Sequence, residues 1–109
     1  MKTLSLLLVL LFSFSAFAIS NAKVEDLLRQ RGLTVEELGE QGMEVFMGEN
    51  TGHLPFNKVR IIITENEAIL RSEIDSVDLS GSTLGSVKSV RYNGRYLLKS
   101  DIKAAVSKR

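Results

Sequence analysis

The sequence contains no cysteine, no tryptophan and only one proline. A chain without thiols forms no disulfide, although small extracellular domains usually need disulfides because a short chain buries little apolar surface. The lack of cysteine also excludes a thiol nucleophile. With His53 as the only imidazole, zinc has too few of its usual ligands. None of the five asparagines has serine or threonine two residues later, so the chain carries no N-glycosylation acceptor. These absences argue against a disulfide-stapled or glycosylated extracellular domain of the animal type.

The first 18 residues have the composition of a secretory signal peptide. Lys2 supplies the positive start, Leu4 to Phe17 is apolar except for three serines, and Ala16-Phe17-Ala18 offers small residues for cleavage. A second acceptable cut follows Ala22. The run is shorter than the ~20 apolar residues of a membrane-spanning helix, and an uncleaved anchor is the alternative. We expect an exported bacterial protein, periplasmic or secreted, with one small domain over residues 23–109 and only weak membrane contact apart from the signal peptide.

Charge is balanced overall but unevenly distributed. Without Lys2 the chain has 13 basic and 13 acidic residues, which argues against a dedicated binder of polyanions such as DNA. Residues 23–87 hold six basic and twelve acidic side chains, a net charge of −6, whereas residues 88–109 hold seven basic and one acidic, a net of +6. Such asymmetry can guide an acidic partner or a second copy of the chain.

Apolar spacing predicts a mixed fold. Residues 24–31 and 35–40 have helical spacing, and Thr34 with Glu37 forms a capping box for the second helix. Short strands are expected at 43–47, at 58–64 and 68–74, which form a central hairpin, and at 87–92 and 95–99 around Asn93-Gly94, the strongest hairpin signal in the chain. A two-residue turn there pairs Tyr92 with Arg95. Ser100 is expected to cap a short basic helix over 101–107.

These segments together predict the α+β class, with an N-terminal helical pair, a mainly antiparallel sheet of four or five strands and a short C-terminal helix. A largely disordered chain is the alternative, because aromatic residues make up only 6% of the sequence.

Motifs for catalysis are scarce. His53 lies in a glycine-rich loop without a recognisable partner, no Gly-x-Ser-x-Gly elbow is present, and the carboxylates near 65–78 lack the order of a calcium loop. We expect no cofactor, no metal and no catalytic residue. A small hydrolase that uses His53 with a carboxylate is the enzymatic alternative.

The candidate binding residues are basic and aromatic, and they gather in the C-terminal quarter of the chain. They are Lys88, Arg91, Tyr92, Arg95, Tyr96, Lys99 and Lys103. Cations interleaved with aromatic rings are typical of surfaces that meet acidic groups. We therefore expect a non-enzymatic interaction module, a regulator, inhibitor or assembly accessory, whose partner is a protein with an acidic patch or a second copy of the chain. A cationic binder of anionic envelope polymers is the other alternative.

Overall fold

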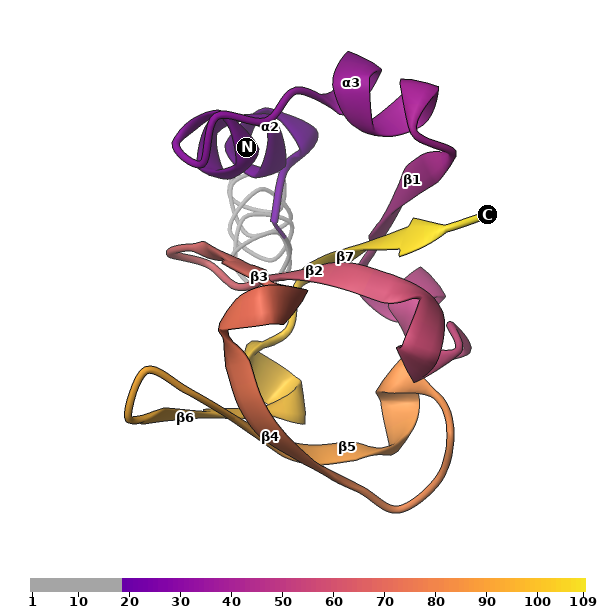
Figure 1. Ribbon diagram of the computed structural model, residues 1–109, viewed down its shortest axis with the longest axis vertical. Coiled ribbons are helices and arrows are strands. Elements are labelled where there is room, and N and C mark those ends of the chain that lie inside the picture. Colours follow the sequence, from indigo (N-terminus) through magenta and orange to yellow (C-terminus); the bar gives the residue numbers. More distant parts are fainter. Residues whose placement is uncertain (1–18) are drawn as a thin grey trace, which may run out of the picture.

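The computed structural model describes residues 19–109 and shows two antiparallel sheets packed against each other (Figure 1). The first sheet has the order β1 (Met43–Met47), β7 (Ala104–Lys108), β2 (Val59–Ile63) and β3 (Ala68–Leu70). The second has the order β4 (Ile74–Leu79), β5 (Val87–Tyr92) and β6 (Arg95–Leu98). The mixed class is confirmed, with seven strands in two sheets in place of the expected four or five. The predicted signal peptide at residues 1–18 lies outside the described residues.

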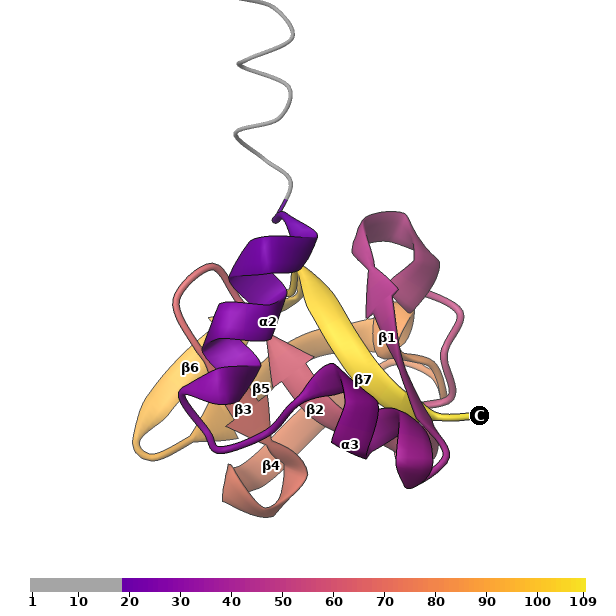
Figure 2. The ribbon, with the colours of Figure 1, turned by 90° about the horizontal axis from the view of Figure 1, so that it is seen from above.

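Two helices, α2 (Asn21–Arg29) and α3 (Val35–Glu40), lie over the outer face of the first sheet (Figure 2). The Ser20 hydroxyl accepts a hydrogen bond from the backbone amide of Lys23, and the Thr34 hydroxyl accepts one from that of Glu37. Both bonds satisfy amides that the first turn of a helix leaves unpaired. The helices bury Val24, Leu27, Leu28 and Leu38, side chains that mark the faces turned toward the sheet.

The two sheets and the helices enclose two cores. The inner core lies between the sheets and contains Ile62 with Val90, whereas the outer core lies between the helices and the first sheet and contains Ile61 with Ile63. Successive strand residues point to opposite faces, so β2 supplies both cores. This double burial explains why residues 61–63 are an unbroken run of isoleucine.

The predicted C-terminal helix is wrong, because residues 104–108 form β7. This strand lies between β1 and β2, and Ala104, Ala105, Val106 and Ser107 are fully buried. Ala104 and Val106 enter the outer core while Ala105 enters the inner core. The small apolar residues 104–106 suit a helix in isolation, but burial on both faces and pairing on both edges favour a strand here.

Both predicted hairpins form. Asn93 and Gly94 have φ values of +48° and +75°, as a type I′ turn requires, and Tyr92 pairs with Arg95 as predicted. In the central hairpin Ile61 pairs with Leu70. Its second strand is divided, because a 3₁₀ turn at Arg71–Glu73 ends β3 and sends Ile74 into the other sheet.

An internal repeat relates the two sheets. The sequence Leu70-Arg-Ser-Glu-Ile74 recurs 28 positions later as Leu98-Lys-Ser-Asp-Ile102. Each copy forms a 3₁₀ turn whose acidic side chain accepts a hydrogen bond from the leucine amide. Glu73 Oε1 lies 2.9 Å from the Leu70 nitrogen, and Asp101 Oδ2 lies 2.9 Å from that of Leu98. The two turns are therefore equivalent corners, each leading from a hairpin into the opposite sheet.

The same offset of 28 residues relates the strand pairs. Ile62 faces Ala105 between β2 and β7, and Val90 faces Val77 between β5 and β4. The halves meet reciprocally at the Pro55–Thr83 bridge, where the Leu84 amide donates to the Leu54 carbonyl and the Phe56 amide to that of Ser82, at 2.8 and 2.9 Å. Reciprocal contacts of this kind are the signature of a two-fold relation. Residues 54–79 and 82–107 are thus two similar halves.

Candidate functional site

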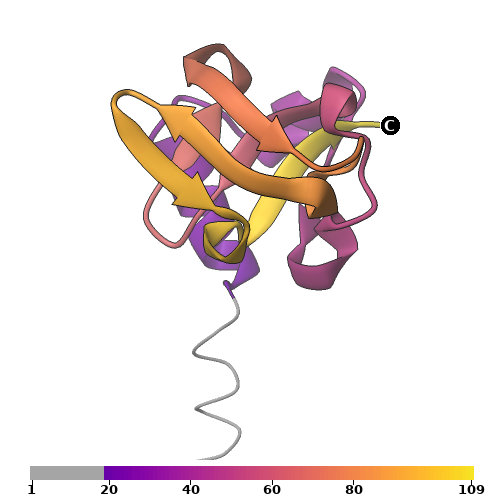
Figure 3. The same ribbon diagram turned by 90° about the horizontal axis from the view of Figure 1, so that it is seen from below.

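The repeat allows the outer faces of the two sheets to be compared position by position. On the first sheet the outward side chains are apolar and belong to the core under the helices, namely Ile61, Ile63, Ala68, Leu70, Ala104 and Val106. The equivalent residues of the second sheet are Ser89, Arg91, Tyr96, Leu98, Ser76 and Asp78. Figure 3 shows the second sheet in front, with α2 and α3 behind it on the far side of the first sheet. We call these six residues the open face.

The open face is polar along β4, which carries Ser76 and Asp78, and mainly apolar along β6. Tyr96 is 70% exposed and Leu98 is 55% exposed, both high values for large apolar side chains. Tyr96 is the cross-strand neighbour of Arg91, whose guanidinium carbon lies 5.9 Å from the centre of the tyrosine ring. Such a pair contributes about 0.5–1 kcal/mol at an exposed site. The face therefore presents an aromatic ring, an aliphatic side chain and a cation side by side.

Lys88 adds a second cation close to this face. The register between β4 and β5 shifts where Asp78 pairs with Ser89 and Leu79 with Val87, so Lys88 is an extra residue on its strand. The equivalent shift in β2 occurs between Val59 and Ile61. Lys88 is exposed, so its ammonium group is free to meet a partner.

Tyr92 and Arg95 are part of an internal contact instead. Tyr92 is only 5% exposed, and its hydroxyl donates a hydrogen bond of 2.7 Å to Glu67 Oε1. Burial, followed by the hydrogen bond to Glu67, raises the pKa of Tyr92 above its ordinary value of 10.0. Arg95 Nη2 lies 3.1 Å from Glu67 Oε2, and its guanidinium carbon lies 5.0 Å from the centre of the Tyr92 ring. The contact joins the turn of the first sheet to the second sheet and leaves Tyr92 unavailable as a binding platform.

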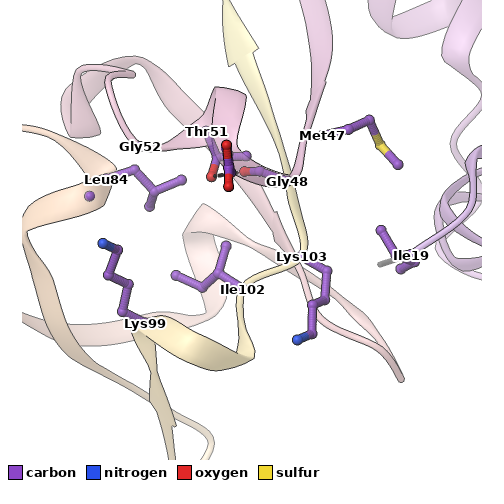
Figure 4. Close-up of a pocket in the computed structure, with 11 residues that line it drawn as sticks. Ile19, Met47, Gly48, Thr51, Gly52, Leu84, Lys99, Ile102 and Lys103 are labelled. Carbon is purple, nitrogen blue, oxygen red and sulfur yellow. Dashed lines mark hydrogen bonds between the residues drawn. The ribbon is translucent and has the colours of Figure 1, made fainter. Parts of the chain in front are cut away.

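Lys99 and Lys103 lie elsewhere, at a pocket of about 810 Å³ beside the second corner (Figure 4). Met47, Leu84 and Ile102 give this pocket an apolar lining. The Lys99 side chain points toward Leu84, whereas the Lys103 ammonium donates a hydrogen bond of 3.2 Å to the Ser100 carbonyl. The seven predicted binding residues are therefore divided among the open face, the Glu67 contact and this pocket. Lys103 also lines a smaller polar pocket of about 330 Å³ together with Tyr92, Arg95 and Tyr96.

The pocket is explained by differences between the repeats. Its residues Leu84 and Lys99 are equivalent to Phe56 and Arg71 in the other half. There, Arg71 Nη1 donates to the Phe56 and Val59 carbonyls at 2.6 and 2.8 Å, and its guanidinium carbon lies 4.6 Å from the centre of the Phe56 ring. In the second half, Leu84 is smaller than Phe56, and Lys99 has no guanidinium group to bridge two carbonyls as Arg71 does. The equivalent corner is therefore open.

His53 is exposed, and within residues 19–109 no carboxylate forms a hydrogen bond with it. In that same part of the chain no three histidine, aspartate or glutamate side chains gather in a metal-binding arrangement. No helix described for residues 19–109 is long and apolar enough to cross a membrane.

Comparison with other proteins gave no relative. No protein-family model, curated protein or solved structure matches the chain.

Sequence reasoning found Arg91, Tyr96 and the neighbouring Lys88 but missed four residues of the open face, namely Ser76, Asp78, Ser89 and Leu98. The missed residues lie on different strands, and their common face becomes visible only when β4 is paired with β5. The repeat of 28 residues was the available signal, because it shows which residues of the second sheet correspond to the helix-covered residues of the first.

Proposed function

We propose that the protein is an exported, non-enzymatic interaction module that docks a partner protein on the open face. The observation that carries this proposal is the contrast between the two halves. Helices cover the outer residues of the first sheet, whereas the equivalent positions of the second sheet expose Tyr96 and Leu98. Exposed apolar side chains that lie together on a sheet are typical of docking sites.

The side chains of the open face indicate the chemistry of the partner. Tyrosine and arginine are enriched in the residues that contribute most to protein interfaces. Arg91 and Lys88 favour carboxylates, while Tyr96 and Leu98 favour an apolar surface. We infer a partner that presents an apolar patch flanked by acidic residues. The other predicted basic residues do not lie on the open face. This arrangement favours a local contact with a protein over an extended cationic surface that binds anionic polymers.

The contacts of Ile19 and Ser20 favour signal-peptide cleavage after Ala18 over cleavage after Ala22. Ile19 packs against the outer core, and the Ser20 hydroxyl caps α2. Cleavage after Ala18 leaves both residues in place, whereas cleavage after Ala22 removes the cap and the first two residues of α2. We therefore predict Ile19 as the N-terminal residue of the protein purified from the bacterial envelope, as measured by intact mass. An N-terminus at Met1 would contradict export with cleavage, and one at Lys23 would contradict the preferred cut.

The docking proposal is tested by quantitative capture from envelope extract. Wild type is compared with Tyr96→Ala combined with Leu98→Ser, and with Arg91→Glu. The matched control is Val35→Ser, which removes an apolar side chain that is 36% exposed on α3, away from the open face. We expect recovery of one protein to fall at least about tenfold with the open-face variants and to stay unchanged with the control. Equal recovery by all variants, each folded by circular dichroism, contradicts docking on the open face.

A further inference from the structure

The repeat also shows that a strand edge that is paired in one half is unpaired in the other. β7 lies between β2 and β1, and β1 pairs with it in antiparallel register from Met43–Lys108 to Met47–Ala104. β4 is the equivalent of β7, yet it pairs only with β5. Within residues 19–109 no other strand lies against the free edge of β4. The position that β1 occupies in one half is therefore vacant in the other.

The vacancy leaves the inner core less covered at this edge. Phe46 of β1 lies opposite Ala105 and packs against the inner core, and Ala105 is fully buried. Val77, the equivalent of Ala105, packs against the same core but is only half-buried. Leu79 is half-buried too, whereas its equivalent Ser107 is fully buried. A strand beside β4 would cover both apolar side chains.

We propose that the partner adds an extended strand to β4, antiparallel to it and in the position equivalent to that of β1. The inference rests on the proposed function, because it states how the partner engages the sheet that carries the open face. Backbone hydrogen bonds along an open edge supply affinity in strand addition, and alternate side chains supply specificity. The residue opposite Val77 is apolar, as Phe46 is opposite Ala105. The residue opposite Asp78 lies on the outer face and is basic.

Charge distinguishes a partner from a second copy of the chain. β4 carries two exposed carboxylates, Asp75 and Asp78. If two copies paired through β4, four carboxylates would come together, and neither strand has a basic side chain to offset them. Uncompensated like charges destabilise a strand pair, and charges on an edge strand commonly prevent self-association. The acidic edge therefore selects a different protein, whose added strand carries a basic residue opposite Asp78 while its acidic residues meet Arg91 and Lys88.

The test uses a probe peptide and the ¹⁵N-labelled protein purified after export. The probe is the segment 41–49 of this chain with Val45→Lys, because Val45 faces Val106, the equivalent of Asp78. At millimolar peptide we expect shifts of amide resonances concentrated in β4, and amide exchange in β4 slowed at least about tenfold. The matched control is the same peptide with the amides that face β4 methylated, which cannot form the backbone bonds. The variant Asp78→Lys should weaken binding of the lysine peptide.

Three results would overturn the strand inference, namely no shifts, shifts centred on β7, or equal shifts with the methylated peptide. The proposed function fails separately. If the peptide binds β4 but the open-face variants capture the partner normally, the open face is not the docking surface. If the open-face variants lose capture but the peptide does not bind, the partner docks without adding a strand.

Discussion

Glu67 is the residue that ties the two sheets together at the turn between β2 and β3. Its carboxylate accepts hydrogen bonds from the Tyr92 hydroxyl and from Arg95. Tyr92→Phe keeps the buried ring and removes the bond, so we expect the free energy of unfolding to fall by about 1–2 kcal/mol at pH 7 in urea titrations. Tyr96→Phe is the matched control, because Tyr96 is 70% exposed and should lose little. Equal losses from both variants would show that the Glu67 bond is not stabilising.

The same contact predicts the direction of the alkaline response. The pKa of Tyr92 is raised in the folded protein, so the unfolded chain releases this proton first as the pH increases. The contribution of the protonated Tyr92 to the free energy of unfolding is complete below pH 10.0, its ordinary pKa. It is lost as the pH rises through the higher pKa of the folded protein. The difference between wild type and Tyr92→Phe should therefore shrink above about pH 10.

Arg31 and Glu73 connect the segment after α2 to the first 3₁₀ corner. Their side chains lie 2.7 Å apart, and the bond from Arg31 is the main cause that lowers the pKa of Glu73 below 4.5. A carboxyl group with a lowered pKa stabilises the folded protein at pH values above its ordinary pKa. This contribution is lost as the pH falls through the pKa of the group in the folded protein.

We predict that Arg31→Gln costs about 0.5–1 kcal/mol at pH 7, because the pair is partly exposed and screened by water. The cost should fade in urea titrations as the pH falls below 4.5. A cost that is the same at pH 7 and at pH 2.5 would exclude the ion pair as its source.

Among the turns, the one between β5 and β6 depends most clearly on a glycine. Gly94 has a φ of +75°, in the left-handed region that side chains disfavour. Gly94→Ala should lower the free energy of unfolding by about 1–2 kcal/mol. Gly39→Ala is the matched control, since Gly39 lies in α3 with open space at its Cβ position and should gain about 0.5–1 kcal/mol. Thermal unfolding of both variants measures the effects, and shifts in the same direction would contradict the assignment.

Elements with strong local signals were predictable, and those that depend on long-range pairing were not. Asn93-Gly94 specifies its turn by backbone conformation alone, and the register of β5 and β6 follows from it. β7 was mistaken for a helix because its partners are distant, β1 at residues 43–47 and β2 at 59–63. Ile74 was assigned to the central hairpin because the corner at Arg71–Glu73 has no strong breaker such as glycine or proline.

For the molecule as a whole, the uneven charge of the sequence was a partial guide. The basic C-terminal part contributes Arg91 and Lys88 to the open side of the second sheet, but Lys99 and Lys103 lie at the pocket. No local pattern states which sheet the helices cover, so the exposed face could not be identified without the fold. Comparison of Leu70-Arg-Ser-Glu-Ile74 with Leu98-Lys-Ser-Asp-Ile102 would have revealed the two halves and directed attention to their differences.

Residue-resolved amide hydrogen exchange of the exported protein tests most directly whether the second sheet is the open side of the molecule. β7 is paired on both edges and covered by the helices, so its amides should be protected throughout. β4 is paired on one edge only, so alternate amides between Ile74 and Leu79 should exchange much faster than their equivalents in β7. Uniform protection of β4 to the level of β7 in the isolated protein would contradict a free edge and the docking account built on it.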